Sequence, residues 1–356
     1  MRRNSRWVLM GCGVAFLCLI AGLLISSFIG GEKKIQQHLK RLYALDDPRF
    51  MQELGVLLGP PFLQDGLIAQ MTQAGVQVKR FHPLHWSNLG RMNNRTHRKL
   101  LVVDGRVGFT GGVGVAPQWT GRAQNPSQWR DTHFEVLGPV VAQMQAVFID
   151  NWIKVTGDVL HGPDYFPALA PVGTAWAQMF SSSPSGGSES MQLMYLLAVT
   201  SASVSIDLSA AYFVPDTLNQ QALVDALKRG VRLRIVVPGK HIDSDAVRGA
   251  SRATWGPLLS AGATIAEYGP TMYHCKVMIV DGLLTSVGST NFDNRSFRLN
   301  DEATLNIVDP AFARAQTATF ESDLALSHRV SHAEWQNRPV REKLGERLAS
   351  LLSAQR

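Results

Sequence analysis

Two copies of one short pattern constrain this chain more than any other feature. Each copy has a histidine, a lysine two residues later and an aspartate five residues after the lysine: His97, Lys99, Asp104 and His274, Lys276, Asp281. A glycine-containing segment follows each copy, and the offset between Gly111 and Gly288 equals the offset between the two histidines. A constant offset over this many positions indicates an internal repeat.

The spacing has a structural meaning. The apolar runs 100–103 and 277–280 favour buried strands, and side chains two residues apart on a strand lie on the same face. Each histidine is therefore expected beside its own lysine. Asp104 and Asp281 both precede a glycine, and Asp-Gly favours a two-residue hairpin turn. Two roles stay open for these aspartates, one in catalysis and one in the turn.

Two imidazoles and two fixed cations suit chemistry at a phosphate. If the halves face each other, one histidine can attack phosphorus while the other protonates the leaving oxygen. The lysines would hold the phosphate oxygens and neutralise charge that develops during the reaction. Further phosphate contacts are expected from the glycine-containing segments, namely from Asn291, Gly112 and Ser289. This scheme requires no metal and no cofactor.

The paired motif resembles the HKD motif of the phospholipase D superfamily, and within it the chain is most similar to bacterial cardiolipin synthases. Three segments carry the resemblance: Thr96-His97-Arg98-Lys99, Tyr212-Phe213-Val214-Pro215-Asp216 and 288–296, which begins Gly288-Ser289-Thr290-Asn291. The resemblance covers most of residues 67–330. It implies a phosphatidyl-histidine intermediate, with His97 as the nucleophile and His274 as the acid and then the base. The first copy departs from the family pattern because Gly114 stands where the second copy has Asn291.

A catalytic histidine needs a carboxylate that fixes its tautomer and stabilises its charged form. Asp131 and Glu302 begin expected strands in the two halves, each at the same distance before the proline that opens a helix. We expect Glu302 to orient His274 and Asp131 to orient His97. The alternative is that each is an ordinary acid at the end of a strand.

The N-terminal part of the chain is strongly apolar. Trp7–Ile29 contains no charged residue, and as a helix this stretch would be about 35 Å long, enough to cross a hydrocarbon core of about 30 Å. We expect a single-pass anchor in a bacterial plasma membrane. The net charge of +7 suits an anionic partner. Together these features favour an anionic membrane as the partner. The resemblance to cardiolipin synthases implies phosphatidylglycerol and cardiolipin as the lipids, and no nucleic acid is expected.

The fold class expected from these observations is α/β, with two phospholipase D-like repeats, each a mixed sheet flanked by helices, after a transmembrane helix. The expected divisions are an anchor (1–31), a helical neck (32–66), a first repeat (67–170), a connecting loop (171–200), a second repeat (201–330) and a C-terminal helix (331–356). The second half has a strand, helix and strand within 204–237, and the first half shows no equivalent β-rich run before residue 75. The first repeat is therefore expected to be shortened.

The activity that this sequence predicts is a membrane-bound phosphatidyltransferase making cardiolipin from phosphatidylglycerol. Two alternatives stay open. A nuclease or other phosphodiesterase of the superfamily would use the same residues on a different diester. A shortened member with little or no activity would keep the motifs without turnover.

Overall fold

The computed structural model describes residues 56–58, 65–81, 95–184 and 190–353. Up to residue 156 the elements are β1 (Val56–Leu58), α3 (Asp65–Gln73), β2 (Val78–Arg80), β3 (Arg95–Thr96), β4 (Leu100–Val103), β5 (Val107–Gly111), the 3-10 helix η2 (Pro117–Trp119), β6 (His133–Leu137) and α4 (Val140–Thr156). After it come β7 (Trp176–Ser182), α5 (Ser190–Ser201), β8 (Ser205–Ala210), β9 (Phe213–Val214), α6 (Thr217–Lys228), β10 (Arg232–Pro238), α7 (Asp245–Ala253), α8 (Trp255–Ser260), β11 (Thr264–Tyr268), β12 (Lys276–Val280), β13 (Leu284–Gly288), β14 (Phe292–Asp293), α9 (Asn294–Arg298), β15 (Asn300–Val308), α10 (Pro310–Ala325), β16 (Ser327–Val330), α11 (His332–Gln336) and α12 (Val340–Ser353).

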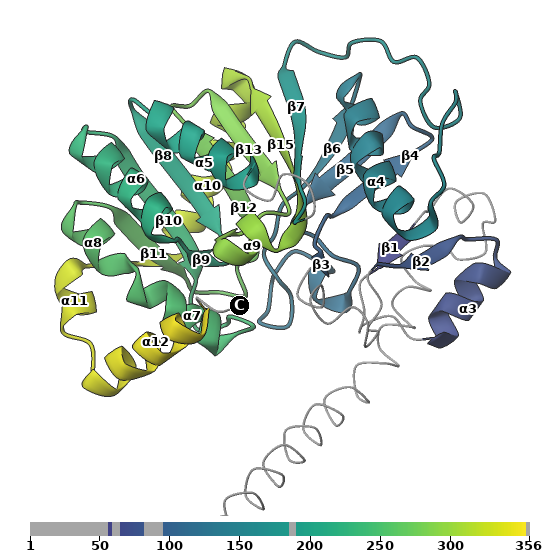
Figure 1. The fold of residues 1–356 in the computed structure, drawn as a ribbon. Helices are drawn as coiled ribbons and strands as arrows, with labels where there is room; N and C mark the ends of the chain where they lie inside the picture. The colour runs from purple at the N-terminus through teal and green to yellow at the C-terminus, as the bar shows by residue number, and fades with distance from the viewer. Residues whose placement is uncertain (1–55, 59–64, 82–94, 185–189, 354–356) are drawn as a thin grey trace, which may run out of the picture.

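A large mixed sheet forms the body of the second half (Figure 1). Its strands lie in the order β16, β11, β10, β8, β12, β13, β15, and β7 pairs with β15. Strands β8, β10 and β11 are parallel, because α6 and then α7 and α8 carry the chain back between them. The strand, helix and strand expected within 204–237 are thereby confirmed.

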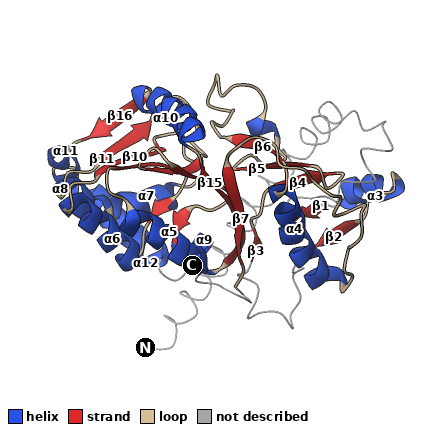
Figure 2. Cartoon of the chain, turned by 90° about the horizontal axis from the view of Figure 1, so that it is seen from above, coloured by secondary structure: helices blue, strands red, loops and turns tan. Residues whose placement is uncertain are grey.

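Helices cover both faces of this sheet, as Figure 2 shows from above. One face packs on α5, α6 and α8, with Ile206, Leu233 and Ile235 among its fully buried strand residues. The other face packs on α10 and, from the first half, on residues of β6 and α4 such as Met144. Because this second core draws on both halves, burial of apolar side chains holds the halves together.

The first half has a much smaller sheet. Strands β4, β5 and β6 form an antiparallel meander, while β1 and β2 form a separate parallel pair. In the second half β8 lies between β10 and β12 and joins the parallel strands to the hairpin. Among the described residues no strand takes that position beside β4. The four residues of β4 are accordingly only partly buried, whereas all five of β12 are buried.

Two expected segments differ in the structure. Residues 56–58, expected within a helical neck, form strand β1, since Val56, Leu57 and Leu58 pair with β2. The rest of the neck up to residue 55 lies outside the described residues, as does the expected anchor at 7–29. Residues 171–200, expected as a connecting loop, contain β7 and α5. Strand β7 pairs along its whole length with β15, and α5 buries Met191 and Tyr195 in the core.

None of the described helices is both long enough and apolar enough to span a bilayer.

The two hairpins after the motifs have the same backbone. Asp104 and Asp281 each have φ of 53°, followed by Gly105 at 63° and Gly282 at 61°. Two successive positive φ values match the type I′ turn that joins twisted antiparallel strands. The turn expected at each Asp-Gly is confirmed, and this conformation accounts for the glycine.

The two aspartates differ in what they hold. The Asp281 carboxylate accepts backbone N–H groups from Ser203, Val204 and Ser205 at 2.8–2.9 Å, so it fixes the start of β8. These bonds lower the pKa of Asp281, although desolvation opposes them. Asp104 makes no such contact within the described part of the chain, where the first half has no counterpart of β8.

We predict that Asp281→Ala destabilises the protein by roughly 2 kcal/mol, because it leaves backbone donors at the start of β8 without their acceptor. Asp104→Ala is the matched control in the same turn and should change stability by less than about 0.5 kcal/mol. Denaturant unfolding of both variants measures the difference. Equal losses of stability would contradict the assignment of Asp281 to the β8 junction.

Candidate active site

The residue just before each motif histidine pairs with backbone from the other half of the chain. Strand β15 extends past β13 and pairs in parallel with β3, so Asp301 lies opposite Thr96. The backbone N–H of His97 then donates to Asp301 O at 2.9 Å. In the same way Arg130 bridges in parallel to Tyr273, and the N–H of His274 donates to Arg130 O at 2.7 Å. The residue after each crossing therefore lies beside the other half's histidine.

Those residues are the two carboxylates. His97 Nδ1 lies 3.0 Å from both carboxylate oxygens of Glu302, and His274 Nδ1 lies 2.7 Å from Asp131 Oδ2. The sequence predicted the opposite pairing, Glu302 with His274 and Asp131 with His97, and that prediction is wrong. The physical reason is the crossed strand pairing, which gives each carboxylate to the histidine of the other half.

Both carboxylates are held in place away from water. The side chain of Glu302 is fully buried, and it accepts hydrogen bonds from Ser289 Oγ at 2.5 Å and Asn300 Nδ2 at 3.2 Å. The Asp131 side chain is 1% exposed and accepts from the Trp119 indole N–H at 3.0 Å and from the Thr132 N–H at 2.8 Å. A carboxylate fixed by several donors cannot rotate away from its imidazole. Each Nδ1 is thus held as the N–H donor, and each Nε2 keeps its lone pair.

The two lysines lie in the same relation to their own motifs. Lys99 Nζ donates to His97 O at 3.2 Å, and Lys276 Nζ donates to His274 O at 2.6 Å. Burial and, after it, the positive charge of Lys276 together lower the pKa of Lys99 to about 8. Each lysine also lowers the pKa of the other half's histidine. These cross-half effects support a single site that contains both lysines and both histidines.

Both histidines are neutral near pH 7. Burial is the largest cause that lowers the pKa of His97, against an opposing effect of Glu302. The pKa of His274 falls to about 3, chiefly through burial and then through Lys276. Lys276 Nζ lies 3.0 and 3.1 Å from the two ring nitrogens of His274. A neutral imidazole can attack phosphorus, and an incoming anion that draws Lys276 away would raise the proton affinity of His274.

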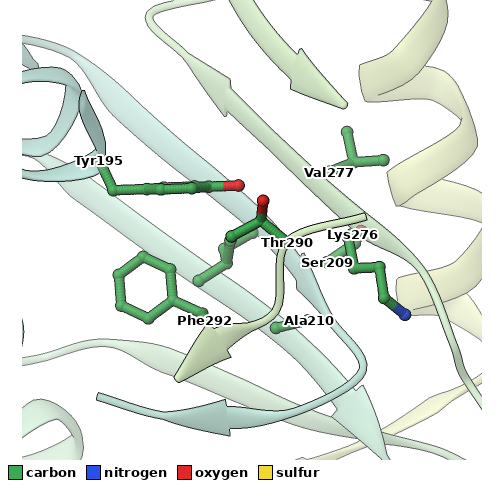
Figure 3. A pocket seen from close by; sticks show the side chains of 8 residues that line it. Tyr195, Ser209, Ala210, Lys276, Val277, Thr290 and Phe292 are labelled. Carbon is green, nitrogen blue, oxygen red and sulfur yellow. The ribbon is translucent and has the colours of Figure 1, made fainter. Parts of the chain in front are cut away.

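The three residues predicted to bind phosphate, Asn291, Ser289 and Gly112, have different surroundings in the structure. The buried side chain of Asn291 has an Oδ1 that accepts no hydrogen bond from the described residues, and a phosphate oxygen would have to be bound through its Nδ2 instead. Ser289, predicted to bind phosphate, instead donates to Glu302. Gly112 lies directly against Asp131, where an added Cβ would come within 2.3 Å of Oδ1. Thr290 and Phe292 line a small pocket beside Lys276 that is too tight for a water molecule (Figure 3).

Asp104 and Asp281, predicted as catalytic residues, do not belong to this site. Asp281 follows β12, so at about 3.3 Å per residue it lies roughly 16 Å along the strand from Lys276. Its hydrogen bonds to Ser203–Ser205 support the other role that the sequence left open, in the turn.

Several residues of the site were not singled out from the sequence. Trp119 and Trp129 pack against His274, with ring centroids 5.4 and 5.1 Å away. Arg130 bonds Asp323 through both ends of its guanidinium at 2.9 Å. Arg98 lies between the motif residues and joins α4 to the carbonyl of Ser182. The only hint in the sequence was that one long loop contains two tryptophans. The residues around them do not indicate that they contact His274, which is far away in the sequence.

We predict that Glu302→Gln lowers the pKa of His97 by about 1 to 3, because it removes the negative charge that favours the imidazolium. Asp131→Asn is the control and should leave the titration of His97 nearly unchanged. NMR titration of labelled histidine, assigned with a His97→Asn variant, measures both. A larger effect of Asp131→Asn on His97 would contradict the crossed pairing.

Lys99 gives a second prediction that depends on pH. Its pKa of about 8 means that the cation is present below pH 8 and is lost as the pH rises further. Affinity for sulfate, an anion that does not titrate in this range, should fall above pH 8 by up to about tenfold for each pH unit. Calorimetry at constant ionic strength measures it. Lys99→Arg keeps its charge and should show a flatter profile; an equally steep profile would place the titration elsewhere.

Comparison with known proteins finds related sequences. The family profile described as "Cardiolipin synthase, PLD-like domain" matches residues 195–324. Cardiolipin synthase A of Pseudomonas fluorescens is 36% identical over 83% of this chain, and the chain covers 61% of that protein. Cardiolipin synthase A of Pseudomonas syringae pv. syringae is 34% identical over 93% of this chain, which covers 69% of that protein.

Among solved structures, the phosphatidylserine synthase of Haemophilus influenzae has a similar fold. The TM-score is 0.54 at 14% sequence identity, over 73% of this chain and 69% of that one. The mixed α/β fold is therefore shared. The chain spans about three fifths of the length of the first curated relatives that it matches.

Proposed function

The chain belongs to the bacterial cardiolipin synthase family, with its phospholipase D-like domain, and from that premise we propose that it is a phosphatidyltransferase that makes cardiolipin from phosphatidylglycerol. One observation carries the proposal: the crossed carboxylates hold the Nδ1 atoms of His97 and His274, which leaves two Nε2 atoms available to one phosphate. Such a site has a nucleophile and a proton carrier without any further group.

The reaction has two steps. Binding of the anionic lipid draws Lys276 away from the His274 ring, and His274 takes up a proton from solvent at Nε2. His97 Nε2 then attacks the phosphorus of this first phosphatidylglycerol, the bond from phosphorus to the headgroup oxygen breaks, and His274 gives its Nε2 proton to the departing glycerol. A headgroup hydroxyl of a second phosphatidylglycerol then transfers its proton to His274 and attacks phosphorus. The bond between phosphorus and His97 breaks, which releases cardiolipin and leaves His274 protonated, as it was when His97 attacked.

The difference in exposure supports His97 as the nucleophile. The side chain of His97 is 26% exposed, whereas that of His274 is 7% exposed and packs against two tryptophan rings. A nucleophile must reach phosphorus along the line of the breaking bond, while a proton carrier needs a fixed position. Lys99, Lys276 and Asn291 are proposed to bind the phosphate oxygens and stabilise the negative charge of the transition state.

The location of the enzyme is also a proposal. Trp7–Ile29 is proposed as a single-pass anchor in the bacterial plasma membrane, with anionic phospholipids as substrates and no nucleic-acid partner. The uncharged sequence of this stretch supports an anchor, since a helix of this composition has no polar face to present to water.

The arrangement into two repeats, 67–170 and 201–330, with a shortened first repeat, is proposed as well. The contrast between β4 and β12 supports it: β12 pairs with β8 on one side and β13 on the other, whereas β4 pairs only with β5 among the described strands. Fewer neighbours on β4 mean less rigid support for the first motif. Activity below that of longer family members is expected to follow.

Purified full-length protein in phosphatidylglycerol vesicles should produce cardiolipin and glycerol, separated by thin-layer chromatography. His97→Ala and His274→Ala should each lower the rate by about 10² to 10⁴ or more. His274→Asn, which slows the second step, should allow the phosphatidyl group on His97 to be detected by mass spectrometry.

Labelled DNA and RNA serve as the comparison substrates. Cleavage of nucleic acid with no lipid product would replace the proposal by a nuclease. No product from folded wild-type protein with either substrate would indicate a member without activity. Full activity of either alanine variant would remove the two-histidine mechanism.

A further inference from the structure

The two orienting carboxylates receive their donors from different places. In the second half Ser289 Oγ donates to Glu302 at 2.5 Å. The repeat places Gly112 at the corresponding position of the first half, where there is no hydroxyl. The carboxylate of Asp131 fills that space, because a Cβ on Gly112 would lie 2.3 Å from Oδ1 and 2.6 Å from Oδ2. Asp131 must therefore obtain its donor from elsewhere.

Trp119 supplies that donor. Its indole N–H donates to Asp131 Oδ2 at 3.0 Å, the same oxygen that lies 2.7 Å from His274 Nδ1. The indole ring lies edge-on to the imidazole at 5.4 Å, with the rings inclined by 78°. Trp119 thus contacts both members of the pair, although it comes from the short helix η2, outside the repeated motif.

The space for this ring comes from the one position where the first motif departs from the family pattern. Gly114 corresponds to Asn291 in the repeat. A Cβ on Gly114 would lie 3.1 Å from two carbons of the Trp119 ring, closer than ordinary van der Waals contact. An asparagine side chain at residue 114 would push the ring from its place.

We propose that Trp119 is the positioning residue for His274, that it takes over in the first half the role of Ser289, and that Gly114 replaces asparagine to make room for it. The rings of Trp119 and Trp129 also lie 4.7 Å apart and together shield His274. The first half therefore lacks an asparagine at residue 114 that could bind phosphate, and in return Trp119 holds the pair of Asp131 and His274 in a fixed position. The consequence for turnover rests on the proposed function, whereas the effect on His274 does not.

Removal of the indole donor should have a defined electrical effect. A donor on Oδ2 withdraws negative charge from that oxygen and weakens its attraction for the proton on His274. Without the donor the carboxylate attracts that proton more strongly, so the pKa of His274 should rise. A purely space-filling tryptophan would not have this effect when an aromatic ring is kept.

The test compares Trp119→Phe with Trp129→Phe in the full-length protein. Both variants replace an indole beside His274 by a phenyl ring. Of the two tryptophans, only Trp119 donates a hydrogen bond to Asp131 in the described structure. We expect Trp119→Phe to raise the pKa of His274 in an NMR titration, to move the acid limb of the rate profile to higher pH, and to lower kcat about tenfold. Trp129→Phe should leave the position of that limb unchanged.

A milder variant, Gly114→Ala, guards against misfolding. Its methyl group presses on the indole without removing it, so it should shift the titration of His274 in the same direction by a smaller amount. Unchanged His274 titration in both Trp119→Phe and Gly114→Ala, or equal shifts in Trp119→Phe and Trp129→Phe, would overturn the proposal. If wild-type protein makes no cardiolipin, the proposed function fails while the titration still decides this inference.

Discussion

The exchange of two carboxylates between the halves is the interaction on which the site depends. Neither half orients its own motif histidine: Glu302 of the second half lies against His97 Nδ1, and Asp131 of the first half lies against His274 Nδ1. The exchange follows from two short parallel pairings, β3 with the start of β15 and Arg130 with Tyr273. A site assembled in this way exists only when both halves are folded and packed. The shared apolar core that includes Met144 and Val277 keeps them packed.

Burial and charge act against each other at this site. Burial lowers the pKa values of His97 and His274, while the adjacent carboxylates raise them. Burial is the main reason that the pKa of Lys99 is lowered to about 8, and repulsion by the charge of Lys276 adds to it. An anionic phosphodiester would relieve that repulsion. The charges of the site are therefore arranged to suit a negative ligand.

The two halves share a motif but have become physically different. Asp281 ties its hairpin to β8, and the matching Asp104 has no such strand to hold in the described part of the chain. Near the histidines, the Ser289 hydroxyl donates a hydrogen bond to Glu302, whereas the Trp119 indole donates one to Asp131. The Trp119 ring lies against Gly114. These differences give His97 the more open position and His274 the more enclosed one.

The sequence by itself determined the parts of this protein that depend on neighbouring residues. Motif spacing placed each lysine beside its histidine, apolar runs marked β4 and β12, and Asp-Gly identified the type I′ turns. Only the tertiary structure decided the pairing of Glu302 with His97 and of Asp131 with His274. These partners are 205 and 143 residues apart, and their contact results from strands that cross between the halves. No local pattern of residues encodes that crossing, because it is fixed by how two complete sheets pack against each other.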